Sequence, residues 1–243
     1  MPLKLQSSNW MLHATKLLKQ KLGSPAPFPI LTTTQIEQSL RVIQTLNSRA
    51  DFERSQQKRA AVLVPILDIA TKGPSILFTK RSSKTGTHAN EISFPGGHFD
   101  EHFDGDSLYR TALRETIEEL TPSQHQGPIY DFENYVQLLG HASTIPSMKG
   151  VWVTPIIGAF TPTFPDEHTV DHVYFPGNPS EVSLVFTVSI RDLIKSESSE
   201  PLPRLGQGNL GPTFLTSHGK IWGLTAIILR PILHQLLNPI LNP

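Results

Sequence analysis

Residues 94–120 read FPGGHFDEHFDGDSLYRTALRETIEEL, and the order of residue types in this stretch decides how the chain is interpreted. Two adjacent glycines open it, an acid-rich loop follows, and glutamates at 115, 118 and 119 close it. Between His98 and Glu119 there are seven carboxylates and two arginines. Like charges at such spacings repel one another. We therefore expect a cation to bind near these carboxylates and reduce their repulsion.

The spacing predicts an α-helix that starts near Asp106 or Ser107. Residues 104–107 supply capping side chains and negative charge, both of which favour a helix N-terminus. At 100° per residue, the three glutamates fall within an arc of about 100°. Apolar side chains cluster on the opposite side, at Tyr109, Leu113, Ile117 and Leu120. One face is therefore predicted to pack on a sheet while the other presents three carboxylates.

Three carboxylates on one helix face suit a divalent cation. Hard cations such as Mg²⁺ prefer oxygen ligands and usually share their coordination shell with substrate phosphates. A glycine turn nearby would let the backbone approach closely, so the pattern indicates a phosphoryl-transfer site. The alternative is a solvated acidic face, and the carboxylates alone leave both interpretations open.

Composition narrows the class of protein. The chain has 243 residues, 38% of them hydrophobic, and its 21 Lys and Arg residues balance 21 Asp and Glu residues. This balance gives no support for a nucleic-acid partner. The absence of cysteine excludes disulfides, Cys-ligated zinc and a thiol nucleophile. No apolar run approaches the roughly 20 residues that a membrane span needs.

Residues 1–33 are predicted to be an N-terminal extension, and residues 34–243 to form one domain. Residues 1–36 hold four lysines and no acidic residue, which is similar to a mitochondrial presequence, although an exposed basic helix explains them equally well. The chain ends Leu-Asn-Pro, so a peroxisomal Ser-Lys-Leu signal is not seen. A mitochondrial or cytoplasmic location is expected.

Periodicity predicts an α/β or α+β sandwich within the domain. A helical stripe of apolar residues covers 36–46, and another begins near Leu224 and continues to 237 with a kink at Pro231. Apolar runs rich in β-branched residues predict strands between and around the helices. These strand candidates are 60–69, 75–81, 135–144, 151–160 and 180–190.

Two further patterns have a simple structural explanation. Gly206, Gly208 and Gly211 have the spacing of a dinucleotide-binding turn, but prolines flank them, so we predict a flexible loop at 205–211. His168 and His172 would form a metal pair if they lay on a helix. Nearby prolines and the lack of a third strong ligand favour a solvated loop instead.

Gly97 followed by Arg114-Glu115-x-x-Glu118-Glu119 resembles the signature of the Nudix hydrolases, which is a glycine, a loop and then REUxEE. The resemblance implies a mixed β-sheet sandwiched between α-helices and cleavage of nucleoside diphosphates linked to another moiety, with Mg²⁺ or Mn²⁺ as cofactor. It further implies that Glu118 and Glu119 bind metal, that Glu115 binds metal or orients water, and that the Gly97 carbonyl completes the shell. Arg114 would hold a glutamate through a charge-assisted pair.

The sequence departs from the signature in three ways. Arg114 follows Gly97 by 17 positions rather than 14, and the family's additional glutamate, eight residues before the arginine, falls on Asp106. Thr121 stands where a glycine usually ends the helix. A longer loop costs little closure entropy, so these changes bear on the metal geometry rather than on the family.

The flanks resemble the coenzyme A diphosphatase branch of this superfamily. LFTKRSSKTGTHANEISFPGG at 77–97 is similar to the branch pattern LLTxRSxxxRxHAGxxxFPGG, with Gly86 in place of an arginine and Asn90 in place of a glycine. NPSEVSLVFTVSI at 178–190 and IWGLTAIIL at 221–229 resemble later branch segments. The resemblance covers residues 59–237. It implies phosphate or supporting contacts from Lys80, Arg81, Lys84 and His88.

The expected activity is hydrolysis of coenzyme A or acyl-coenzyme A to 3',5'-ADP and the (acyl-)4'-phosphopantetheine. Glu181 is the candidate for an additional base or metal ligand beyond the signature, and a surface glutamate at a strand end is the alternative. Two other functions stay open: a Nudix hydrolase of ADP-ribose or NADH, and a Nudix-like binding module without turnover. The expected partner is a small molecule, and the sequence leaves monomer and homodimer open.

Overall fold

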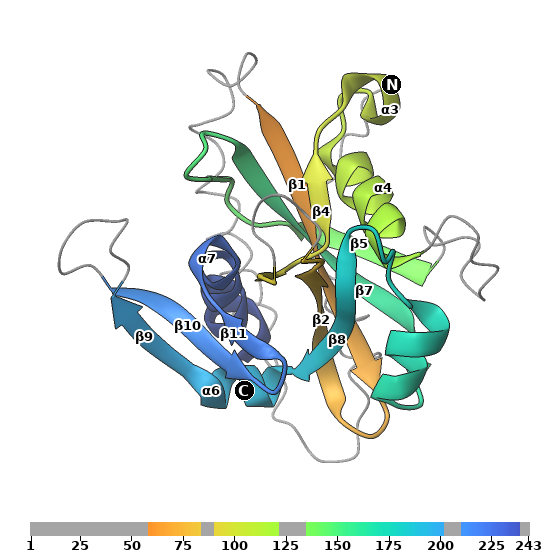
Figure 1. Ribbon diagram of the computed structural model, residues 1–243, viewed down its shortest axis with the longest axis vertical. Coiled ribbons are helices and arrows are strands. Elements are labelled where there is room, and N and C mark those ends of the chain that lie inside the picture. The colour runs from red at the N-terminus through yellow and green to blue at the C-terminus, as the bar shows by residue number, and fades with distance from the viewer. Residues whose placement is uncertain (1–57, 84–89, 122–134, 202–209, 239–243) are drawn as a thin grey trace, which may run out of the picture.

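The computed structural model describes residues 58–83, 90–121, 135–201 and 210–238. The predicted extension at 1–33 and the predicted helix at 36–46 therefore lie outside the described residues. Within the described part, a mixed β-sheet is covered by helices on both faces (Figure 1). The predicted mixed sheet between helices is confirmed.

The sheet has the strand order β3-β2-β1-β7-β5, and three further strands join it: β4 pairs with β1, β6 with β7 and β8 with β2. The long central strands β1 and β7 run parallel, and the other pairs are antiparallel. The strands are β1 (Arg59–Ile69), β2 (Gly73–Arg81), β3 (Ile92–Ser93), β4 (Gly96–His98), β5 (Val136–His141), β6 (Ile145–Pro146), β7 (Trp152–Phe164) and β8 (Val182–Ser189). All five predicted strands are present.

One face of the sheet carries α4 (Leu108–Leu120), preceded by the short α3 (Glu101–Asp104), and a π-helical segment, η1 (Thr169–Tyr174). Ser107 caps α4 by accepting a hydrogen bond from the Arg110 N–H at 3.4 Å. Leu113 and Leu120 are buried on the sheet with strand residues such as Leu63 and Phe160. The predicted start and apolar face of this helix are therefore confirmed.

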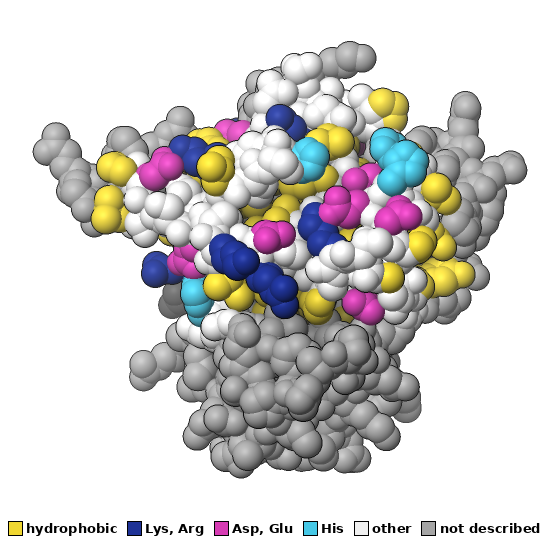
Figure 2. Space-filling view, turned by 90° about the horizontal axis from the view of Figure 1, so that it is seen from below, with side chains coloured by type: hydrophobic (Ala, Val, Ile, Leu, Met, Phe, Trp, Pro, Cys, Tyr) yellow, Lys and Arg dark blue, Asp and Glu magenta, His cyan; other side chains and the backbone are white. Residues whose placement is uncertain are grey.

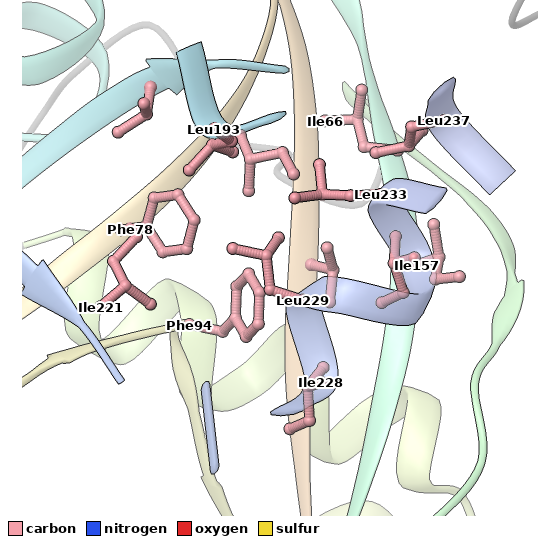
Figure 3. Close-up of a cluster of buried hydrophobic side chains, with 14 of the residues drawn as sticks. Ile66, Phe78, Phe94, Ile157, Leu193, Ile221, Ile228, Leu229, Leu233 and Leu237 are labelled. Carbon is pink, nitrogen blue, oxygen red and sulfur yellow. The ribbon is translucent and has the colours of Figure 1, made fainter. Parts of the chain in front are cut away.

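The opposite face carries α6 (Ile190–Ser196), α7 (Gly223–Pro231) and a second π-helical segment, η3 (Ile232–Leu237). Figure 3 shows Leu229, Leu233 and Leu237 of the last two directed toward strand residues such as Ile66 and Ile157. The α-helix ends at Pro231, which lacks the N–H that the regular pattern needs. The predicted irregularity at this proline is a change of helix type.

A second, three-stranded sheet was not predicted. It has the order β11-β10-β9 and consists of β9 (Glu197–Pro201), β10 (Leu210–Thr216) and β11 (Gly219–Ile221). The expectation of a loop at 205–211 is wrong at its end, because Leu210 and Gly211 pair with Pro201 and Glu200. Pro212 is tolerated in this short strand, although proline cannot donate to a ladder.

His168 and His172 also differ from expectation. The solvated loop predicted there is a helical turn, and the two imidazole ring centroids lie 4.4 Å apart. Among the described residues, however, no group of three acidic or histidine side chains is arranged to hold a metal ion. The pair therefore has no third ligand in that part of the chain.

The surface agrees with the balanced composition. On the face shown in Figure 2, Lys and Arg side chains are interspersed with Asp and Glu side chains rather than gathered into one basic surface. No described helix is both long and apolar enough to cross a membrane.

Candidate active site

The glycine pair lies on β4, directly beside α4. Gly96 has φ +148°, and a Cβ there would overlap the backbone of Ala61 and Val62 on β1. A Cβ on Gly97 would overlap the carboxylate of Glu115. Only glycine permits this approach of β4 to both neighbours, so the sequence FPGG places the Gly97 backbone against the first glutamate of the signature.

Arg114 is the centre of an ion-pair network. Its Nη1 donates to Glu115 Oε1 at 2.9 Å and lies 3.5 Å from Glu118 Oε1, and its Nη2 donates to the His98 carbonyl at 3.1 Å. The remaining side of the guanidinium forms a two-point pair with Asp104, through Nε and Nη2, each at 2.9 Å. A planar guanidinium held at this many points fixes Glu115 relative to β4.

The sequence placed Asp104 among the capping residues of the helix, whereas the structure places it in this network. It is 1% exposed and also accepts hydrogen bonds from the Thr111 hydroxyl at 2.8 Å and the Asp100 N–H at 2.9 Å. The hydrogen bond from Arg114 is the main reason that the pKa of Asp104 is lowered to about 2. Asp104 is therefore ionised and fully paired.

Asp106, eight residues before Arg114, takes no part in the described ion pairs of Arg114. Asp106 is exposed, and the carboxylate that meets Arg114 is two residues earlier, at the end of α3. The loop is longer than in the signature, so counting back a fixed number of residues from the arginine does not find the acid that pairs with it. The burial of one acid among several in HFDEHFDGD carries no signal in a single sequence.

Glu119 is buried, with 4% of its surface exposed. Its Oε2 accepts from the Thr79 hydroxyl at 3.4 Å, and its Oε1 lies 4.0 Å from the Arg81 guanidinium. Burial is the main cause that raises the pKa of Glu119 to about 8, and the positive charge of Arg81 only partly opposes it. The sequence placed this glutamate on a presented face, whereas the structure turns it inward against β2.

Glu181 comes directly before β8 and joins the same group of acids. The negative charge of Glu181 contributes to the raised pKa of both Glu119 and Glu115, so the three carboxylates lie within electrostatic reach of one another. Its position is fixed because its carbonyl accepts from the Ser82 N–H at 2.7 Å. Burial is the main cause that raises the pKa of Glu115.

The end of α4 is closed without the usual glycine. The Thr121 N–H and hydroxyl both donate to the Ile117 carbonyl, at 3.0 and 2.6 Å. The N–H groups of Gly177 and Asn178 donate to the carbonyls of Leu120 and Glu119. These partners satisfy the last carbonyls of the helix, so Thr121 does not disturb the glutamates before it.

The remaining candidates divide into two groups. Glu118 is the exposed member of the signature, with 54% of its side chain accessible. Arg81 lies beside Glu119, whereas Lys80 contacts a different part of the protein, the carbonyl of His218, at 3.2 Å. Lys84 and His88 lie outside the described residues, so their predicted contacts stay predictions.

The donor set suits a hard divalent cation, because it consists of carboxylates beside a backbone that approaches closely at Gly97. Burial raises the pKa values of two of these carboxylates, Glu115 and Glu119, and the nearby guanidinium groups only partly oppose it. In the described part of the chain, no three of them already surround one point as ligands. Arg114 instead holds Glu115 and Glu118.

Comparisons with known proteins agree with this geometry. The family model for the NUDIX domain matches residues 57–199. A relative from Salmonella paratyphi B, described as "Uncharacterized Nudix hydrolase NudL", is 30% identical over 204 residues, which cover 83% of this chain and 94% of the relative. A relative of the same description from Salmonella typhimurium matches equally well.

Solved Nudix structures are also among the matches. A NUDIX hydrolase from Alicyclobacillus acidocaldarius has a TM-score of 0.40 at 17% identity, covering 65% of this chain and 86% of that one. DR0079 from Deinococcus radiodurans has a TM-score of 0.41 at 15% identity, covering 75% and 87%. The sequence matches carry the assignment. The domain match and the relatives indicate a hydrolase of phosphoric anhydrides, and the chain belongs to the Nudix family.

Proposed function

We propose that this Nudix hydrolase cleaves the diphosphate of coenzyme A and acyl-coenzyme A, giving 3',5'-ADP and the (acyl-)4'-phosphopantetheine. The observation that carries the proposal is the placement of two residues from the branch-like segment 77–97. Its threonine and arginine, Thr79 and Arg81, lie against the buried glutamate of the signature. A substrate-recognition segment is expected to border the reacting group in this way.

Glu115, Glu118, Glu119 and the Gly97 carbonyl would hold Mg²⁺ or Mn²⁺. The Nudix family generally uses divalent metals, and oxygen donors of this kind suit both ions. The bound ion would supply Lewis acidity toward the diphosphate and offset its negative charge. The raised pKa values of Glu115 and Glu119 support this assignment, because a nearby cation favours the charged form of a carboxylate.

Glu181 is the proposed general base, and Arg114 the residue that positions Glu115. Glu115 is already held by a hydrogen bond from Arg114 and is proposed here as a metal ligand, which leaves Glu181 for the proton transfer. Glu181 lies close enough to Glu115 and Glu119 to influence both. It would accept the proton of the water that attacks phosphorus.

Arg81 is proposed to contact the diphosphate itself. Its guanidinium stands beside Glu119, and its Nε is buried and has no hydrogen-bond partner among the described residues. A buried donor that lacks a partner costs free energy, and a phosphate oxygen would supply one. Planar guanidinium groups suit phosphate oxygens.

Product analysis tests the proposal. The full chain is incubated with Mg²⁺ or Mn²⁺ and, separately, with coenzyme A, acetyl-coenzyme A, ADP-ribose and NADH, and the products are separated by chromatography. We expect 3',5'-ADP from both coenzyme A substrates at rates well above those for the other two. Cleavage of ADP-ribose or NADH alone would refute the substrate assignment, and no cleavage of any substrate would favour a binding module.

A further inference from the structure

Lys80 and Arg81 are neighbours on β2 but serve different parts of the protein. Successive side chains of a strand point to opposite faces of the sheet. Arg81 is directed to Glu119, on the face covered by α4. The ammonium group of Lys80 donates instead to the His218 carbonyl at 3.2 Å, in the turn between β10 and β11. The second sheet, which the sequence did not predict, thus brings a turn to this lysine.

The charge of Lys80 is not neutralised by the described residues. Its only described hydrogen bond is to a neutral carbonyl, and no described carboxylate forms an ion pair with it. Two other lysines nearby in the fold differ in this respect. Lys220, on β11, lies 2.6 Å from Glu200, and Lys72 forms an ion pair with Glu167.

His218 adds a neutral polar ring to this place. Its imidazole packs on Phe186, with the ring centroids 4.5 Å apart. Burial lowers the pKa of His218 first, and the positive charges of Lys72 and Lys80 lower it further. The side chain is therefore uncharged near neutral pH. It offers a hydrogen bond beside the ammonium group without adding a carboxylate that would repel an anion.

Lys80 and Arg81 lie at an irregular part of the pairing between β2 and β8. The register of β8 against β2 shifts between Lys80 and Arg81, and Ser183 is the exposed extra residue. The Ser183 hydroxyl donates to the carbonyls of both Lys80 and Arg81, at 3.1 and 3.3 Å. Beyond β2, β8 pairs with no other described strand. Only β8 therefore separates Lys80 and Arg81 from this edge of the described sheet.

We propose that Lys80 and His218 form a second anion subsite that binds a phosphomonoester of the substrate, separate from the diphosphate that is cleaved. In coenzyme A this group is the 3'-phosphate of the ribose. The inference rests on the proposed function, and it gives two adjacent basic residues different binding roles. Arg81 serves the diphosphate, and Lys80 serves the phosphate that distinguishes coenzyme A from its 3'-dephospho form.

The test compares two substrates that differ only in this phosphate. The kcat/KM of the full chain is measured with coenzyme A and with 3'-dephospho-coenzyme A, for wild type, Lys80→Gln and Lys80→Arg. We expect wild type to prefer coenzyme A by about three- to tenfold, the size of an exposed charge–phosphate contact. Lys80→Gln should bring the ratio close to one mainly through KM for coenzyme A, and Lys80→Arg should keep most of the preference.

Lys220→Gln is the matched control. Lys220 lies in the β10–β11 hairpin that also holds His218, and its charge is already paired with Glu200. Its ratio should equal that of wild type. An unchanged ratio in Lys80→Gln, equal losses with both substrates, or no preference in wild type would each overturn the subsite. Equal losses would mean that Lys80 acts only through the general field of the protein.

Binding of the product separates this inference from the proposed function. Calorimetry without metal compares 3',5'-ADP with AMP, which lacks the 3'-phosphate, on wild type and Lys80→Gln. A preference for 3',5'-ADP that Lys80→Gln removes would support the subsite even if neither coenzyme A substrate were cleaved, in which case the proposed activity alone fails. Equal binding of both nucleotides by wild type would overturn the subsite whether or not the chain is active.

Discussion

The two faces of the central sheet are built on opposite principles. The face under α7 and η3 is covered by apolar side chains, and Leu229 and Leu233 are fully buried there. The face under α4 also has an apolar core, but that helix carries a buried glutamate and an arginine network at its edge. Buried charge costs free energy unless it is paired. A protein tolerates such a charge where function needs it. We therefore call the face under α7 and η3 the structural face, and the face under α4 the chemical face.

The largest contrast should come from Glu119→Gln on the chemical face. We expect kcat to fall by about a thousandfold if Glu119 binds the metal as proposed, because such a ligand contributes several kcal/mol to the transition state. Stability of the metal-free protein should be kept or rise, because glutamine removes the cost of ionising a buried carboxyl whose pKa is raised to about 8. Steady-state kinetics and urea unfolding measure the two effects. Unfolding of this variant would show that Glu119 is structural.

Leu233→Ala tests the structural face. The side chain is fully buried between η3 and the sheet, so its truncation should lower the free energy of unfolding by about 2–5 kcal/mol. Activity per folded molecule should stay close to wild type. Leu215→Ala is the control, because that leucine is 70% exposed and its loss should change stability by only about 0.5 kcal/mol or less. A loss of kcat in folded Leu233→Ala would remove the distinction between the faces.

Asp104→Asn sharpens the comparison, because Asp104 belongs to the chemical face but acts through Arg114. We expect a loss of about 2–4 kcal/mol, since a partly buried guanidinium loses its carboxylate, together with a lower kcat. Asp106→Asn, two residues away and exposed, should change neither quantity appreciably. If the two variants behaved alike, the assignment of Asp104 as the partner of Arg114 would be wrong.

The lowered pKa of Asp104 predicts that the free energy of unfolding falls at acid pH. The pKa of Asp104 is about 2 in the folded protein, compared with 3.8 for an unperturbed group. A lowered carboxyl pKa contributes stability above the unfolded value, and this contribution is lost as pH falls from about 4 toward 2. Urea unfolding between pH 2 and 6 should therefore show a shallower acid limb for Asp104→Asn than for wild type. Parallel curves for the two proteins would contradict the pairing.

The smallest effect is expected at the edge of the structural face. Glu197 on β9 lies 2.9 Å from Arg230 Nε and also contacts His234, which ties the last helical segments to the second sheet. Both basic side chains are largely exposed, so Glu197→Gln should cost about 1 kcal/mol or less. The difference from wild type should shrink in about 0.5 M salt. A loss as large as that of Leu233→Ala would mean that this contact organises the face.

Periodicity predicted most of the fold, because the five strands and two helices that carry the sandwich have strong apolar patterns. The second sheet was missed because ESSEP, at 197–201, has no apolar alternation and Pro212 argues against a strand. Its pairing comes from tertiary contact rather than from local preference. The register shift at Ser183 likewise depends on the neighbouring strand and has no local signature.

The acidic helix could be predicted because its spacing and its resemblance to a known signature agree. The inward orientation of Glu119 could not be predicted, and neither could the pairing of Arg114 with Asp104 rather than Asp106. Both depend on how the loop folds back on β4. The separate directions of Lys80 and Arg81 follow from strand geometry once the strand end is known. Predicting their separate partners would require knowing where α4 and the 216–219 turn lie in the fold.

The central claim is that the carboxylates of the chemical face bind a divalent cation. Calorimetric titration of the full chain with Mn²⁺, with and without 3',5'-ADP, measures this directly, with Glu119→Gln alongside. We predict saturable uptake by wild type that is at least about tenfold weaker in the variant. No uptake by wild type under either condition, or identical uptake by both proteins, would contradict the account.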